Sequence, residues 1–96
     1  MKASPNTTVV HGILRRAEPA SDGFGGDVGI EVTDNASPEP AADFIRPEAG
    51  ATLQAFYGGL DPAATRALIG RRVRVELTYN AGPGGGRAVV RALEPD

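Results

Sequence analysis

The 96-residue sequence has no cysteine, and this absence excludes a disulfide, a thiolate metal site and a cysteine nucleophile. It has no apolar run of about 18 residues, the length that a membrane-spanning helix needs, and its first ten residues contain no apolar stretch of signal-peptide length. The sequence therefore predicts a cytoplasmic protein without a membrane partner. An exported chain whose signal had been removed would show the same features.

Residues that could perform catalysis are also scarce. The single histidine, His11, has neither a nucleophile nor an orienting group at a spacing typical of a general base. Ser4, Ser21 and Ser37 lie in breaker-rich segments, and none stands in a G-x-S-x-G elbow. We interpret His11 as a strand histidine with a hydrogen-bond partner at one end of the fold, and we expect no catalytic residue and no enzyme activity.

Two segments have the composition of a ligand site but not its spacing. Asp22, Asp27, Glu31 and Asp34 could supply oxygen ligands to a calcium ion, but they lack the alternate spacing of an EF-hand. Residues 82–86 (GPGGG) are rich in glycine, but a phosphate cradle needs a helix after the loop, and a strand is expected there. The sequence therefore predicts no metal and no cofactor.

The charges that are present are unevenly distributed. Nine of the ten basic residues are arginine, which together with abundant alanine, glycine and proline indicates a GC-rich, bacterial genome. The net charge of −2 gives no general attraction to nucleic acid or to anionic lipid. Residues 17–50 carry eight acidic residues against one basic residue, so the negative charge is concentrated in the centre of the chain.

Alternation of apolar and polar residues predicts one β-rich domain, residues 9–93, between tails of residues 1–8 and 94–96. Gly12 predicts a bulge or bend, and it leaves open whether Val9, His11 and Ile13 or Val10 and Leu14 face inward. The five expected strands cover residues 9–17, 27–33, 51–57, 71–79 and 87–93. The residues expected to face inward in the last four strands are Val28, Ile30, Val32, Leu53, Ala55, Tyr57, Val73, Val75, Leu77, Tyr79, Ala88, Val90 and Ala92.

A short helix and a long loop are expected between these strands. Asp61 as N-cap, Pro62 at the first helical position and Gly70 past the end predict a helix over residues 62–69. Residues 34–50 have three prolines and no sustained period, so they are expected to form a long loop. The expected apolar face of the helix is Leu60, Ala64 and Leu68, and the expected anchor of the loop is Phe44 and Ile45.

The order of these elements resembles that of the OB-fold, a small five-stranded Greek-key barrel with a helix between its third and fourth strands. The piece that carries the resemblance best is LDPAATRALIGRRVRVELTYNAGPGGGRAVVRAL, in which a capped helix leads through Gly70 into an alternating strand and a hairpin. An SH3-like barrel and an irregular α+β sheet would use the same strands and helix. The resemblance concerns architecture, and OB-folds have many functions, so it implies no particular one.

The candidate binding residues lie on the outer face of the expected barrel. The OB order would make the first, fourth and fifth strands neighbours, so their outward arginines would form one basic stripe that could follow a phosphate backbone. Phe56, outward on the third strand, could stack on a base. The alternative is a solvated face on which Glu76 and Glu94 neutralise the arginines. The tentative ligand-binding residues are therefore Phe56, Arg72, Arg74, Arg87 and Arg91.

The acidic residues argue against a nucleic-acid ligand. OB-folds bind ligands across the second and third strands and the adjoining loops, where this chain has Glu18, Asp22, Asp27 and Glu31. The leading hypothesis is therefore a non-enzymatic binding or interaction module with a protein or a small uncharged ligand as partner. Weak binding of single-stranded nucleic acid is the second hypothesis, and a small enzyme is the third.

Overall fold

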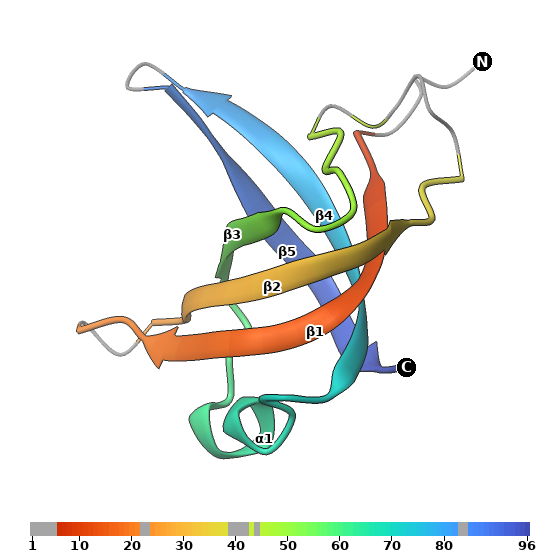
Figure 1. Cartoon of the computed structure of the whole chain (residues 1–96). Helices are drawn as coiled ribbons and strands as arrows, with labels where there is room; N and C mark the ends of the chain where they lie inside the picture. The colour runs from red at the N-terminus through yellow and green to blue at the C-terminus, as the bar shows by residue number, and fades with distance from the viewer. Residues whose placement is uncertain (1–5, 22–23, 39–42, 44, 83–84) are drawn as a thin grey trace.

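The protein is a closed β-barrel of five strands with one short helix between the third and fourth strands (Figure 1). This computed structural model describes residues 6–21, 24–38, 43, 45–82 and 85–96. The strand order is β1-β2-β3-β5-β4, and β4 pairs with β1 to close the barrel. The elements are β1 (Thr8–Pro19), β2 (Gly26–Asn35), β3 (Thr52–Tyr57), α1 (Pro62–Arg66), β4 (Arg72–Gly82) and β5 (Gly85–Pro95).

This arrangement confirms the predicted all-β, OB-like barrel. The neighbour order β5-β4-β1 is the one that the resemblance implied. All adjacent strands are antiparallel except β3 and β5, which are parallel. The strands extend slightly beyond the expected domain limits, because β1 begins at Thr8 and β5 ends at Pro95.

The first strand bends where the sequence predicts it to bend. The register between β1 and β2 shifts between His11 and Gly12 and again between Leu14 and Arg16. A Cβ atom on Gly12 would lie 2.4 Å from the carbonyl oxygen of Glu31, so only glycine fits this close approach. Val10 and Leu14 belong to the core cluster, so the face that carries them points inward. Val9, on the other face, is also buried but lies outside that cluster.

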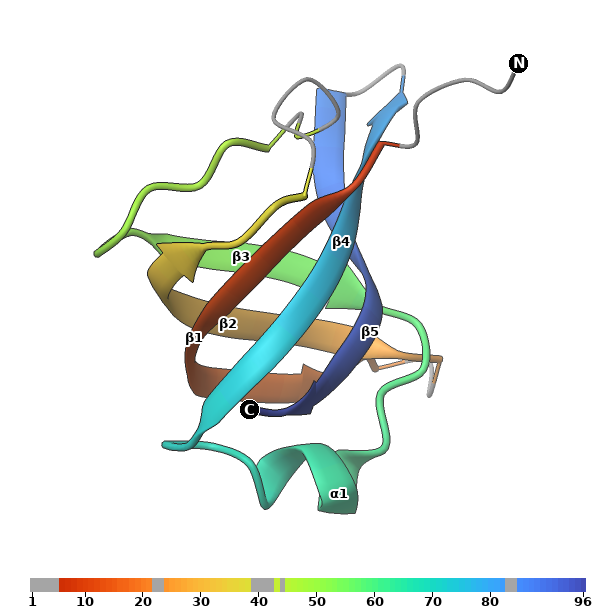
Figure 2. The same ribbon diagram turned by 90° about the vertical axis from the view of Figure 1, so that its right-hand side faces the viewer.

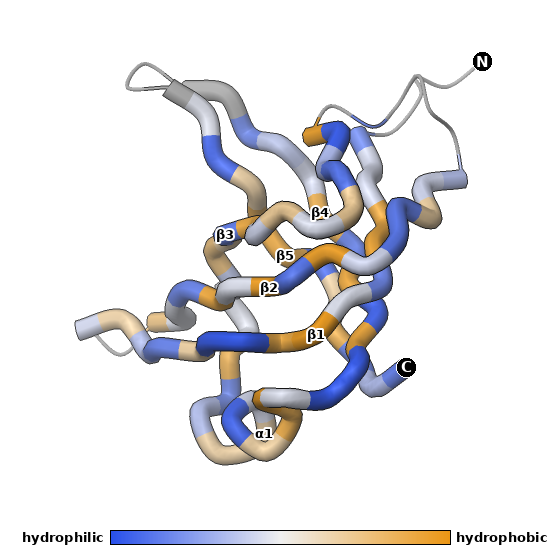
Figure 3. The backbone as a smooth tube through the Cα atoms, viewed as in Figure 1, coloured by the Kyte–Doolittle hydropathy of each residue, from blue (hydrophilic) through white to orange (hydrophobic). Residues whose placement is uncertain are grey.

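The core is a cluster of aliphatic side chains inside the barrel. Apolar and polar residues alternate along β2 and β4 (Figure 3). The inward orientation predicted for Val28, Ile30 and Val32 in β2 and for Val73, Val75 and Leu77 in β4 is confirmed. Such alternation is typical of strands with one buried face. The fully buried aliphatic residues are Val10, Leu14, Val28, Ile30, Val32, Val73, Val75 and Leu77.

Two residues of β4 and β5 that the sequence predicts to face the core, Tyr79 and Ala92, are exposed. The pairing of these strands shifts between Glu76 and Leu77, so Arg91 is the extra residue of a β-bulge. Ala92 is consequently exposed, and Leu93 packs against the core in its place. Tyr79 is 36% exposed because the β4–β5 hairpin extends beyond the barrel at the end opposite α1 (Figures 1 and 2).

The predicted helix is present but shorter than expected. Asp61 caps α1 by accepting hydrogen bonds from the N–H groups of Ala63 and Ala64. The chain then forms i→i−3 turns up to Gly70, whose φ of 87° ends them in the conformation that favours glycine. The Gly70 N–H donates to the Leu14 carbonyl at 2.7 Å, which fixes this end of the helical segment beside β1.

The side of the helical segment that faces the barrel differs from the prediction. Leu60 and Leu68 pack against the core as expected, but Ala64 is exposed and Thr65 is buried. Leu60 precedes the N-cap residue Asp61, so its position does not follow the helical period. The two residues of the helical segment that face the barrel are Thr65 and Leu68, which are three positions apart.

The long loop between β2 and β3 is held by the buried carboxylate of Asp43. Its two oxygens accept hydrogen bonds from the side chains of Thr8 and Asn35 and from the backbone N–H groups of Ile45 and Arg46. Burial alone would raise the pKa of Asp43, but these hydrogen bonds outweigh it and hold that pKa below its ordinary value of 3.8. The predicted anchor residue Ile45 packs against the core, whereas Phe44 lies outside the described residues.

Candidate functional site

The closure of the barrel between β3 and β5 is short, because these two strands pair at only two positions. Their parallel ladder consists of Ala55 with Ala88 and Phe56 with Val89. Before that point the two strands separate, since β3 continues along β2 whereas β5 continues along β4 into the projecting hairpin (Figure 1). A groove lies between Leu53 and Gln54 of β3 and Gly86 and Arg87 of β5.

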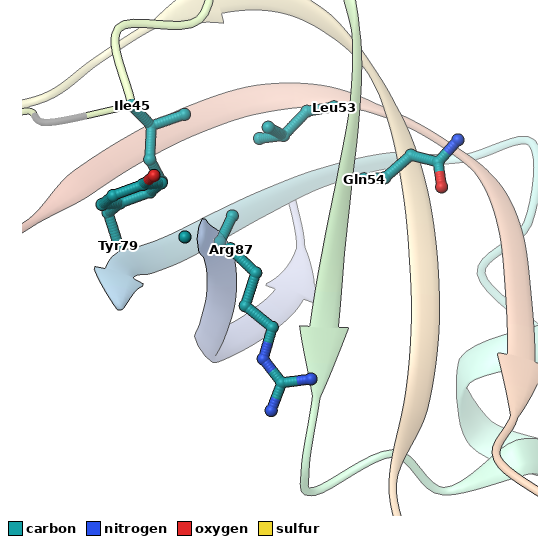
Figure 4. Close-up of a pocket in the computed structure, with 7 residues that line it drawn as sticks. Ile45, Leu53, Gln54, Tyr79 and Arg87 are labelled. Carbon is teal, nitrogen blue, oxygen red and sulfur yellow. The ribbon is translucent and has the colours of Figure 1, made fainter. Parts of the chain in front are cut away.

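The larger part of this groove has both apolar and polar surface. Leu53 and Ala88, which belong to the inner face of the barrel, line it, and Ile45 and Tyr79 lie together at one end (Figure 4). Tyr79 lies over Gly86, since a Cβ on that glycine would coincide with the Tyr79 ring. This part is lined by Ile45, Leu53, Gln54, Tyr79, Gly86, Arg87 and Ala88.

Arg87 links the larger part of the groove to a second, smaller part. Its guanidinium carbon lies 4.5 Å from the centre of the Phe56 ring, a distance typical of a cation–π contact. Asp27 and Phe56 line this second part together with Gln54, Ala55 and Ala88. Within the described part of the chain, Arg87 has no carboxylate partner. It is therefore a cation that remains available for a ligand.

Gln54 is held by an arginine from the opposite side. Arg16, Gly29 and Gln54 are register partners across β1, β2 and β3. Because Gly29 has no side chain, Arg16 reaches over it and donates from Nη2 to the Gln54 carbonyl oxygen at 3.0 Å. The Gln54 amide points away from Arg87 (Figure 4). Among the described residues that line the larger part of the groove, Arg87 is the charged one.

The structure does not gather the four arginines of the predicted stripe around one ligand position. Arg74 lies opposite Glu94, with Nη1 and Oε1 3.5 Å apart, and Arg72 lies 3.4 Å from Asp96. Arg87 is opposite Asn80, six positions further along β4 than Arg74, which corresponds to about 20 Å. The part of the stripe near Arg72 and Arg74 is thus a solvated face with acidic partners.

The remaining candidate residues have separate positions. Arg91 is exposed in the β5 bulge, and Phe56 is half-buried under Arg87. Tyr79 and Leu53 are groove residues that the sequence analysis assigned to the core. The alternation of apolar and polar residues along β3 and β4 correctly places both on the inner face. It does not show that the β4–β5 hairpin leaves the barrel at Tyr79.

Arginines neutralise part of the acidic surface that the sequence predicts near β2. Arg16 forms an ion pair with Glu18, and Arg15 lies 2.7 Å from Glu31. Asp27 faces the groove without such a partner among the described residues, and Asp22 lies outside them. Phe24, in the loop before β2, is 78% exposed.

His11 has a hydrogen-bond partner at the end of the chain. Its Nδ1 lies 2.7 Å from the carboxylate of Asp96, which also contacts Arg72. The hydrogen bond with His11 lowers the pKa of Asp96 below its ordinary value. The residues after the predicted domain boundary are therefore tied to β1 and β4.

The described residues contain neither a metal-ligand cluster nor a membrane-spanning helix. In the residues whose positions are described, no group of three acidic or histidine side chains could hold a metal ion, and no helix is long and apolar enough to cross a membrane. No protein-family model matches the sequence, and no curated protein matches it either.

Proposed function

We propose that this protein is a non-enzymatic interaction module of OB-fold type that binds an extended segment of a partner protein in the groove between β3 and the β4–β5 hairpin. The strand order and the position of α1 support the assignment to the OB-fold. The absence of cysteine favours the cytoplasm as its location, which stays a prediction.

One observation carries the proposal: where β3 and β5 separate, inner-face side chains line a groove next to Arg87, which has no carboxylate partner among the described residues. Leu53 and Tyr79 offer apolar surface, and Arg87 offers one charge at the edge of that surface. Asp27 balances this charge at the other end of the groove. A concave site with apolar side chains, polar surface and few charged groups suits a peptide segment or a small uncharged ligand better than a polyanion.

Single-stranded nucleic acid is the second candidate. The exposure of Phe24 and Tyr79 favours it, because exposed aromatic rings can stack on bases. The ion pairs of Arg72 and Arg74 and the position of Asp27 in the groove oppose it.

An array of capped random-sequence hexapeptides, probed with labelled protein, tests the proposed function. We expect binding by the wild type and by Arg91→Ala, which changes β5 outside the groove, and loss of binding in Tyr79→Ala. Binding of oligothymidylate in parallel, with an affinity that falls steeply with salt, would favour nucleic acid. Absence of peptide binding, together with such salt-dependent binding of oligothymidylate, contradicts the proposal.

A further inference from the structure

The groove contains two open strand edges. Thr52–Gln54 pair with β2 on one side, and Gly85–Arg87 pair with β4 on one side. On the sides that face each other, the ladder begins only at Ala55 and Ala88, and no other described strand pairs there. Unpaired N–H and C=O groups along a strand edge are a template for an additional strand.

The edge of β5 is accessible to another backbone. Two of its three open residues are glycines, and a glycine in a strand permits close approach of a second chain. Natural sheets usually protect an edge with proline, with several charges or with a bulge. Here the bulge lies further along the strand, at Arg91, and Arg87 is the one charged residue of the open segment.

The two sides of this edge differ in chemistry. Gly86 and Ala88 share the inner face with Tyr79 and Leu53, whereas Arg87 is on the outer face. Successive side chains of an added strand would alternate between these faces. Apolar side chains would therefore contact Tyr79 and Leu53, and the side chains between them would lie near the guanidinium of Arg87.

We infer that the partner segment is an extended peptide in which apolar and acidic residues alternate, and that it adds as a strand to the open edge of β5 at Gly85–Arg87. This inference rests on the proposed function and specifies its ligand. Arg87 supplies the charge complementarity, since no described carboxylate pairs with it. A polyanion would instead bring phosphates close to Asp27 as well.

NMR titration with two capped hexapeptides tests the chemistry of the ligand. One peptide alternates valine with glutamate, and the other alternates valine with lysine. We expect the glutamate peptide to bind at least about tenfold more tightly, which corresponds to one charge-assisted hydrogen bond, and to shift the amide signals of Gly86 and Arg87. Arg87→Glu should reverse the preference, whereas Arg91→Glu, on the same strand, should preserve it.

Peptides methylated on alternate backbone nitrogens test the mode of binding. Every second backbone N–H group of a strand points to the same edge. One glutamate peptide is therefore methylated on its odd-numbered nitrogens and another on its even-numbered nitrogens, so that each loses the hydrogen-bond donors of one edge. We expect at least one phase to lose about tenfold in affinity. Equal binding of both methylated peptides and the unmodified peptide would overturn strand addition.

The outcomes separate this inference from the proposed function. If the lysine peptide binds in the groove as tightly as the glutamate peptide, with shifts that Tyr79→Ala abolishes, the inference is wrong and the proposed function stands. If neither hexapeptide nor the random-sequence array binds, both fail. Shifts of Gly86 and Arg87 caused by oligothymidylate alone would also overturn both.

Discussion

Replacing Asp43 with alanine should destabilise the whole barrel, although this residue lies in a loop. The carboxylate is 4% exposed and accepts hydrogen bonds from two side chains and two backbone N–H groups. A hydrogen bond to a charged group contributes about 1.5–3 kcal/mol. Because the four donors share one acceptor group, their contributions do not add, and we expect a total loss of about 3 kcal/mol.

Urea unfolding at pH 7 measures this loss as a lower transition midpoint with an unchanged slope. Glu48→Ala, an exposed change in the same loop, is the control and should alter the free energy of unfolding by less than about 0.5 kcal/mol. Equal midpoints for the Asp43→Ala variant and the wild type would refute the reasoning. Amide exchange at Ile45 should also accelerate, because its N–H loses its acceptor.

The pH dependence of a second variant at this position, Asp43→Asn, follows from the lowered pKa of Asp43. A carboxyl group whose pKa is lower in the folded state than in the unfolded state stabilises the protein at a pH above its unfolded pKa, near 3.8. This stabilisation is lost as the pH falls through the folded-state pKa. The stability difference between wild type and Asp43→Asn should therefore be largest at neutral pH and should shrink below pH 3.8. A difference that stays constant down to pH 2 would contradict this assignment.

Two further pairs of variants test the barrel itself. Gly12→Ala should lower the free energy of unfolding by about 2 kcal/mol or more, because its Cβ would lie 2.4 Å from a backbone oxygen. Gly29→Ala is its control. The Cβ of that variant would meet only the Arg16 side chain, at 3.4 Å, so the thermal midpoint should be nearly unchanged. Leu77→Ala should cost about 2–5 kcal/mol as a fully buried core residue, whereas Tyr79→Ala should cost less than about 1 kcal/mol. Similar losses within either pair, measured by thermal unfolding, would contradict the burial described here.

The elements that the sequence predicts well are those with a strong local signal. Alternation along β2 and β4 identifies their buried faces, and Asp61, Pro62 and Gly70 mark the beginning and end of the helical segment. These signals depend on a few neighbouring residues, so they do not require knowledge of the partner strands.

The features that the sequence does not predict depend on pairing between distant strands. The bulge at Arg91 arises from the register of β5 against β4, and it places Leu93 inward in place of Ala92. The exposure of Tyr79 likewise depends on where β3 and β5 separate. The sequence therefore does not predict the groove, although Arg87, which lines it, was among the candidate residues.

Amide hydrogen exchange with and without the valine–glutamate hexapeptide tests the central claim, that the groove is the binding site, most directly. In the free protein, the edge-facing amides of Thr52–Gln54 and Gly85–Arg87 should exchange faster than those of Ala55 and Ala88, which lie within the ladder. Saturation with peptide should slow exchange in the open segments. Protection confined to the face that carries Arg72 and Arg74, with unchanged exchange in the groove, would contradict the account.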